Sequence, residues 1–169
     1  MNCLHRRNKY ELYYRTSKNI PLRYKADTFV AGGSCTGVFA AVRAARLGAK
    51  VVLVERQNML GGTATAGLVN VWHSLKDTDY KEYVIAGLTG EMTQRLVRAD
   101  AAILKDDPSV AICFDPNRLA YELDKLVSEE KIKVLFHTFA FVSVNENKAV
   151  FDLDGTKIRK LLAKGGSAL

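Results

Sequence analysis

The sequence DTFVAGGSCTGVFAAVRAARLGAKVVLVE, residues 27–55, predicts a strand, a glycine-rich turn, a helix and a second strand in succession. Thr28–Ala31 is a short β-prone run, and the glycine-rich turn follows it directly. Apolar residues then recur at the spacing of one helical face: Val38, Ala41, Val42 and Ala45. Gly48 stands where a helix end favours a residue that can take positive φ. Val51–Val54 is continuously apolar, as strands buried on both faces are.

The turn of this unit carries the features of a dinucleotide-binding site. Gly32 and Gly37 take the first and last glycine positions of a G-x-G-x-x-G pattern, and Ser34 replaces the middle glycine. Backbone amides at the start of the helix can hold a pyrophosphate, aided by the helix dipole. Glu55 ends the second strand at about the 20-residue spacing expected of a ribose-binding acid. The alternative is a βαβ unit whose glycines serve only packing.

Ser34 and Cys35 lie inside this turn and each has two interpretations. A serine side chain can hinder the approach of a phosphate, yet its hydroxyl can also donate a hydrogen bond to a phosphate oxygen. Cys35 could be sensitive to oxidation, but a small buried filler is the interpretation we favour.

The composition of the 169 residues is that of one ordinary globular domain. No apolar run approaches the ~18 residues that cross a bilayer. The three cysteines are far apart, odd in number and without paired metal spacing, which favours free thiols in a reducing compartment. We therefore expect a cytoplasmic protein with no metal site and no membrane contact.

Most of the net charge of +7 comes from residues 1–25, which contain seven Lys or Arg residues and one acidic residue, Glu11. Tyrosines are interleaved among these charges, and basic residues with aromatics could contact nucleic acid. A solvated basic leader that lies across the domain or a partner subunit is the interpretation we favour.

A second glycine cluster follows Glu55. Gly61-Gly62-Thr63-Ala64-Thr65-Ala66-Gly67 is flanked by apolar residues and offers backbone amides with little in front of them. Such a loop could bind the half of a large dinucleotide that extends beyond the first glycine turn. Trp72 and His73 come next and could line a ring-binding pocket, with His73 as proton donor or orienting group; a purely structural histidine is the alternative.

The two glycine clusters with Glu55 between them resemble the FAD-dependent oxidoreductase family, the group with a glutathione-reductase-like FAD/NAD(P)-binding domain. The similarity is strongest over residues 26–73. It implies an α/β Rossmann-like domain over residues 26–169, with a parallel sheet, crossover helices and a small β-meander. It also implies FAD as cofactor. The residues that the resemblance assigns to FAD binding are Gly32, Gly33, Ser34, Cys35, Thr36, Gly37, Glu55, Arg56, Gly61, Gly62 and Thr63.

Two further helices and a strand are predicted after His73. Thr89 is a candidate N-cap for a helix whose apolar stripe is Met92, Leu96, Ala99 and Ile103, with Glu91 and Arg95 as an i,i+4 pair. Asp115-Pro116 begins a second helix. Lys133–Phe136 then joins the parallel sheet as a strand, and we take His137, which follows it, as structural.

Strands are also predicted at Thr138–Ser143 and Ala149–Leu153, with a hairpin turn at Asp154-Gly155. The segment around Asp152 and Asp154 also resembles the first motif of haloacid-dehalogenase-type phosphatases. That chemistry needs a later lysine and carboxylates for magnesium, and the residues after Thr156 are too few to supply them. We therefore favour the hairpin.

In the family that the chain resembles, a further strand, a second glycine-rich turn and a substrate-binding region follow the meander. The sequence after Ala163 lacks this continuation, so we expect a fold incomplete at its C-terminus. Two functions fit: an oxidoreductase that uses FAD on a small organic substrate, or a non-catalytic nucleotide-binding remnant. The second would need another chain or a C-terminal half, and a homo-oligomer is a further option.

Overall fold

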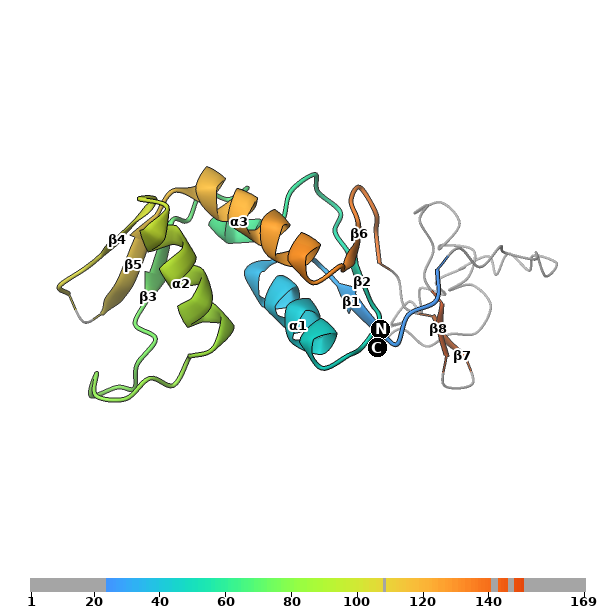
Figure 1. Cartoon of the computed structure of the whole chain (residues 1–169), viewed down its shortest axis with the longest axis horizontal. Coiled ribbons are helices and arrows are strands. Elements are labelled where there is room, and N and C mark those ends of the chain that lie inside the picture. Colours follow the sequence, from blue (N-terminus) through green and yellow to red (C-terminus); the bar gives the residue numbers. More distant parts are fainter. Residues whose placement is uncertain (1–23, 108, 141–142, 146–147, 151–169) are drawn as a thin grey trace, which may run out of the picture. The chain divides into compact units, whose positions relative to one another are not determined.

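The computed structural model describes residues 24–107, 109–140, 143–145 and 148–150 (Figure 1). The chain divides into two units, of which Arg23–Ala140 carries nearly all of the described elements. The other unit contributes the two-stranded antiparallel hairpin of β7 (Ser143–Asn145) and β8 (Lys148–Val150). Among the helices that can be described, none is long and apolar enough to cross a membrane.

A three-stranded parallel sheet is built from β1 (Thr28–Ala31), β2 (Val51–Val54) and β6 (Lys133–Leu135), in the order β1-β2-β6. Thr28 pairs with Val51, and Val52 on the other edge of β2 pairs with Lys133. All four residues of β2 are buried, as predicted for a central strand. The α/β class with a parallel sheet is thus confirmed.

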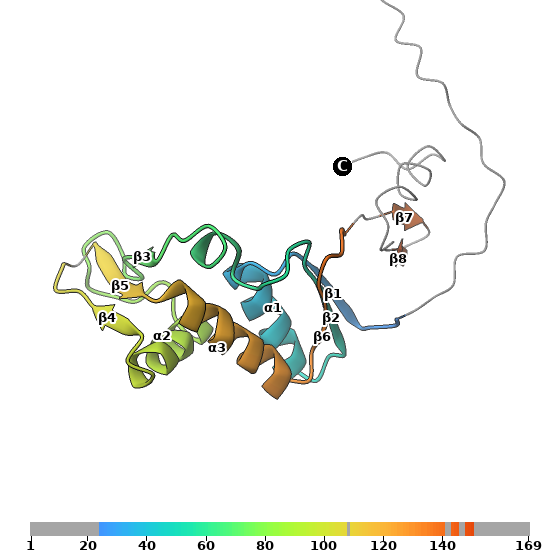
Figure 2. The ribbon, with the colours of Figure 1, turned by 90° about the horizontal axis from the view of Figure 1, so that it is seen from above.

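Two helices pack on this sheet and on each other (Figure 1 and Figure 2). Helix α1 (Cys35–Arg46) buries Val38, Ala41 and Val42, the predicted face. It ends before Gly48, whose φ of 91° is the positive value expected there. Helix α3 (Pro116–Glu129) begins as predicted, because Asp115 accepts hydrogen bonds from the amides of Asn117 and Arg118. The leucines Leu119, Leu123 and Leu126 of α3 are fully buried.

A second, antiparallel sheet has the order β3-β5-β4, from β3 (Val71–His73), β4 (Ala102–Leu104) and β5 (Val110–Phe114). Helix α2 (Leu88–Arg98) precedes β4 and buries Met92 and Leu96. The predicted helical stripe was therefore wrong at its end. Ile103 lies in β4 and is 65% exposed. Thr89 is likewise not the N-cap, which is Gly87.

The end of α2 has a clear physical cause. Asp100 takes a left-handed φ of 51°, a conformation that aspartate tolerates better than most residues. Its amide donates to the carbonyl of Val97 at 3.0 Å, and the amide of Ala101 donates to Leu96 at 2.9 Å. This is the hydrogen-bond pattern of a Schellman motif. The helix therefore ends at Arg98, five residues before the apolar spacing ends at Ile103.

The predicted strands after β6 are only partly correct. His137 has φ 50°, so the extended chain ends there, and Thr138 is buried outside any strand. The first hairpin strand starts at Ser143, where the predicted one ends, and Asn145 pairs with Lys148 of the second. The predicted turn at Asp154-Gly155, and Asp152 beside it, lie outside the described residues.

Candidate functional site

The turn between β1 and α1 is shaped by two glycines. Gly32 has φ 106°, and its amide donates to the carbonyl of Val54 at 2.8 Å, which fixes the turn over the end of β2. A Cβ added at Gly37 would overlap the carbonyl oxygen of Gly32. Only glycine at position 37 therefore lets the first turn of α1 approach the end of β1 this closely.

Ser34, in the place of the middle glycine, is the N-cap of α1. Its hydroxyl oxygen accepts from the amide of Gly37 at 3.3 Å, and its side chain is exposed. The hydroxyl proton is not used in this bond, because a serine hydroxyl both donates and accepts. The amide of Thr36 has no acceptor within the part of the chain that the structure describes. The start of α1 thus has two hydrogen-bond donors available for an anion, the Thr36 amide and the Ser34 hydroxyl.

Glu55 is the most constrained side chain of the site. Although charged, it is only 8% exposed. Its Oε2 accepts from the amide of Gly33 at 2.6 Å, and its Oε1 accepts from the amide of Gln57 at 2.8 Å. Its own amide donates to Leu135 at 2.9 Å. The carboxylate is thereby held against the glycine turn, and each oxygen keeps a second lone pair for another donor.

The second glycine cluster lies against the first. The amide of Gly61 donates to the carbonyl of Gly33 at 2.7 Å, and Ser34 and Gly61 form an isolated parallel bridge. Gly61 and Gly62 both have positive φ, and Gly62 starts a short 3₁₀ turn, η1 (Gly62–Ala64). A Cβ at Gly62 would come within 3.4 Å of the Cβ of Ser34. The two predicted clusters therefore form one continuous surface.

A buried threonine that the sequence reasoning did not single out supports this loop. Thr65 is 3% exposed, and its Oγ1 donates to the carbonyl of Leu60 at 2.5 Å. A methyl at Gly61 would collide with that side chain. Gln57 was also missed, although its amide is one of the two that hold Glu55. Both contacts are short-range in sequence, spanning two residues for Gln57 and five for Thr65, but no motif marks either residue.

Cys35 is half-buried at the junction of the two glycine clusters. Its Sγ donates to the carbonyl of Gly61 at 3.6 Å. Burial raises the pKa of its thiol to about 11, so the thiolate is scarce at neutral pH. Because the thiolate is the reactive form, this position favours a packing role over redox chemistry.

The remaining predicted residues lie at the surface. Arg56 and Thr63 are exposed, and the Thr63 carbonyl accepts from the amide of Val69 at 3.0 Å. His73 lies in β3 of the antiparallel sheet, opposite Val110, and is exposed. Its neighbour Trp72 packs on Phe114 with ring centroids 5.1 Å apart. No hydrogen bond links His73 to the glycine clusters among the residues described, and its role in the site stays a prediction.

Comparison with known proteins finds relatives that share only part of their length with this chain. Mitochondrial dihydrolipoyl dehydrogenase of Schizosaccharomyces pombe is 28% identical over 106 residues, which are 56% of this chain and 21% of that protein. The solved structure of Thermovibrio ammonificans THI4 covers 75% of this chain and 45% of its own, at 16% identity and a TM-score of 0.48. That of 3-ketosteroid-delta4-(5alpha)-dehydrogenase from Rhodococcus jostii RHA1 covers 75% and 43%, at 18% identity and a TM-score of 0.46.

The chain therefore spans about a fifth of the curated relative and less than half of these two solved structures. The family comparison covers much more of this chain itself. The model of the family described as FAD dependent oxidoreductase matches residues 27–163. That range begins just before β1 and includes both glycine clusters, Glu55 and the parallel sheet. The chain belongs to the FAD-dependent oxidoreductase family.

Proposed function

We propose that this chain binds FAD and supplies the nucleotide-binding part of an oxidoreductase that acts on a small organic substrate. The observation that carries the proposal is the direct joining of the two glycine clusters, through the 2.7 Å bond from the Gly61 amide to the Gly33 carbonyl. A cofactor with a long diphosphate linker needs such a continuous, side-chain-poor surface. Family membership over residues 27–163 supports the same cofactor.

The donor set suits a diphosphate. The amide of Thr36 and the hydroxyl of Ser34 lie at the first turn of α1, where the helix dipole also favours negative charge. Gly62 meets the Cβ of Ser34 closely enough that a larger residue at position 62 would narrow the same surface. In this proposal, Ser34 and Thr36 hold the pyrophosphate, while Gly62 and Thr63 lie along the cofactor towards its ring.

Glu55 would bind the adenosine ribose. Its carboxylate is already fixed by the amides of Gly33 and Gln57, so little entropy is lost when it accepts ribose hydroxyls through its remaining lone pairs. A fixed carboxylate also excludes a second anion from this position, so a ribose with free hydroxyls suits it better than a phosphorylated ribose. Arg56 is exposed and is the nearest cation to Glu55 in sequence.

Bound FAD would supply hydride or single-electron chemistry, and the chain's own residues would bind and orient it. No described residue is assigned as catalytic acid, base or nucleophile; His73 is the candidate for ring contact. The second candidate function is a nucleotide-binding remnant that is active only with another chain. This second candidate is supported by the small share, 21%, that the chain spans of the curated relative.

The sharpest test adds charge at the phosphate position without removing the helix cap. Ser34→Asp keeps a strong N-cap for α1, because aspartate caps about as well as serine. It also puts a carboxylate where the pyrophosphate would lie, so FAD binding should weaken at least about tenfold. Ser34→Asn, which is similar in shape and uncharged, should bind FAD much more tightly than Ser34→Asp.

Fluorescence titration of the purified chain with FAD would measure the three affinities, and circular dichroism would verify equal folding. Equal affinities for Ser34→Asp and Ser34→Asn would exclude the pyrophosphate from this turn. Stoichiometric FAD in the wild-type chain, together with turnover of an electron donor, would favour the oxidoreductase. Tight FAD binding without any reduction of the flavin by donors would favour the remnant.

A further inference from the structure

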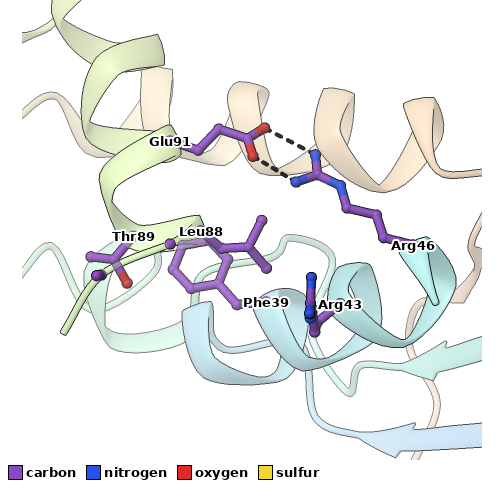
Figure 3. Close-up of a pocket in the computed structure, with 8 residues that line it drawn as sticks. Phe39, Arg43, Arg46, Leu88, Thr89 and Glu91 are labelled. Atoms are coloured by element: carbon purple, nitrogen blue, oxygen red, sulfur yellow. Dashed lines mark hydrogen bonds and ion pairs between the residues drawn. The ribbon is translucent and has the colours of Figure 1, made fainter.

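A hollow of about 520 Å³ lies between α1 and the start of α2, away from the glycine clusters. Figure 3 shows Phe39, Arg43 and Arg46 reaching it from α1, and Leu88 and Glu91 from α2. The three α1 residues are spaced four and three residues apart, which puts them on one face of the helix. The volume is within the range of pockets that bind small molecules, about 300–1,000 Å³.

One wall of the hollow is apolar and firmly supported. Phe39 and Leu88 are half-buried and pack against the hydrophobic core of the unit. Their remaining surface faces the hollow, and the small side chain of Ala86 extends this wall. Because these side chains are supported from behind, the wall does not depend on a ligand for its shape.

Two of the three charged side chains of the hollow are ion-paired with each other, and the third is not paired with any described residue. Arg46 donates to Glu91 twice, from Nη1 at 2.6 Å and from Nη2 at 3.0 Å, so these two charges neutralise each other at the rim. The side chain of Arg43 is exposed and has no hydrogen bond or ion pair with any other residue that the structure describes. The hollow therefore carries one uncompensated positive charge beside an apolar wall.

We propose that this hollow binds a small organic carboxylate, with the carboxylate on the Arg43 guanidinium and an aromatic or branched aliphatic body on Phe39 and Leu88. A guanidinium can hold both oxygens of one carboxylate. A single negative charge matches the single free cation. A phosphate dianion would place its second charge close to the carboxylate of Glu91, which disfavours it.

This site does not depend on the proposed FAD binding, because its residues lie outside both glycine clusters and Glu55. A ligand in it would contact α1 and α2 together. Its binding would therefore stabilise the folded unit by mass action, and the thermal midpoint should rise with ligand concentration.

Benzoate is a suitable probe, and it can be titrated into the full chain without flavin. We expect saturable binding at about millimolar concentration, which is usual for a ligand of this size. Two smaller probes separate the contributions of the ring and the carboxylate to the affinity for benzoate. Benzyl alcohol has the ring without the charge, and acetate has the charge without the ring. Both should bind at least about tenfold more weakly than benzoate. Inorganic phosphate should also bind more weakly.

Four surface variants locate the site. Arg43→Gln should weaken benzoate binding about tenfold, since it removes a charged hydrogen-bond donor. Arg98→Gln is the matched control, because Arg98 is an exposed arginine in the last turn of α2 and does not line the hollow. Ala86→Asp should abolish binding by charge repulsion, whereas Ala86→Asn, of similar size, should retain most of it.

The proposal is overturned if benzoate binds wild type and Arg43→Gln equally, or if wild type shows no saturable binding. It is also overturned if acetate or phosphate binds as tightly as benzoate, since the apolar wall would then contribute nothing. Loss of binding in Arg98→Gln together with Arg43→Gln would point to a diffuse charge effect and would equally reject it. Heteronuclear NMR shift changes confined to residues around Phe39 and Leu88 are the positive result.

Discussion

Arg46 of α1 forms a bidentate ion pair with Glu91 of α2, with Nη1 2.6 Å from Oε2 and Nη2 3.0 Å from Oε1. The Nε of the same arginine donates to Glu130, just past the end of α3, at 2.6 Å. One guanidinium therefore connects three helices. Glu91 in turn accepts from Arg95, which also pairs with Glu129 at 2.6 Å. The helices are joined by a network at the surface in addition to the apolar core.

This network should make stability depend on acid pH through Glu91. Hydrogen bonding from Arg46 is the main cause that lowers the pKa of Glu91 from 4.5 to about 2. A lowered carboxylate pKa contributes stability that is complete above pH 4.5 and is lost as the pH falls to about 2. Glu91→Gln should therefore flatten the fall of the thermal midpoint within this window. Glu82→Gln, at an exposed site with no side-chain ion pair among the described residues, is the control. Parallel acid profiles for wild type and Glu91→Gln would contradict the prediction.

Removing the arginine should have a modest effect near neutral pH. Its partners are partly exposed, with 32% of the Glu91 side chain and 22% of the Glu130 side chain accessible, so water screens the charges. We expect Arg46→Met to lower the free energy of unfolding by about 1 kcal/mol, the upper range for exposed pairs. Urea denaturation would measure it, and the loss should shrink at high salt. A loss unaffected by salt would instead indicate packing of the arginine stem.

The parts of the fold that were predicted correctly are those with local causes. Gly48 ends α1 because a residue with positive φ is needed there, and Asp115 caps α3 with its own carboxylate. Val51–Val54 is a continuous apolar run, and all four of its residues are buried in the central strand of the parallel sheet. Each of these features is set by a few consecutive residues, so the sequence reveals it directly.

The errors have non-local causes. Ile103 continues the apolar spacing of α2, but pairing of β4 with β5, Ile103 opposite Cys113, removes it from the helix. The antiparallel sheet of β3, β4 and β5 was not predicted for the same reason, since short strands need partners to be recognised. At the site, Glu55 was predicted from its distance in sequence to the first glycine of the turn. The two amides that hold Glu55 were not, because Gly33 reaches it only across the folded turn.

The close approach at Gly37 gives a stability prediction with a matched control. Gly37→Ala puts a methyl group into the carbonyl oxygen of Gly32, and this backbone cannot move without shifting the glycine turn. We expect a loss of about 2–4 kcal/mol in urea denaturation, the range of severe core defects. Gly90→Ala, within α2 and with nothing within 4 Å of the added Cβ, should stabilise by about 0.4–1 kcal/mol. Equal effects of the two substitutions would show that the turn tolerates the methyl.

The helix cap at Asp115 should be worth about 1 kcal/mol. Its carboxylate accepts from Asn117 at 2.8 Å and from Arg118 at 3.2 Å, and alanine would leave both amides without this acceptor. Asp115→Ser retains a capping oxygen and should lose much less. The same urea experiment compares the two variants, and equal losses would assign the effect to charge near the helix end, not to the cap.

Glu55→Gln should reduce both stability and FAD affinity, and the two effects can be separated. A glutamine has one acceptor oxygen, so it can satisfy the amide of Gly33 or that of Gln57 but not both in the same way. Leaving a buried amide unpaired costs about 1–3 kcal/mol of unfolding free energy. Asp27→Asn is the control, because Asp27 also accepts a backbone amide, from Lys50 at 2.8 Å, but at an exposed position where water can replace it. If FAD affinity measured on the fully folded Glu55→Gln protein equals that of wild type, Glu55 serves only to hold the glycine turn, and the ribose must be bound elsewhere.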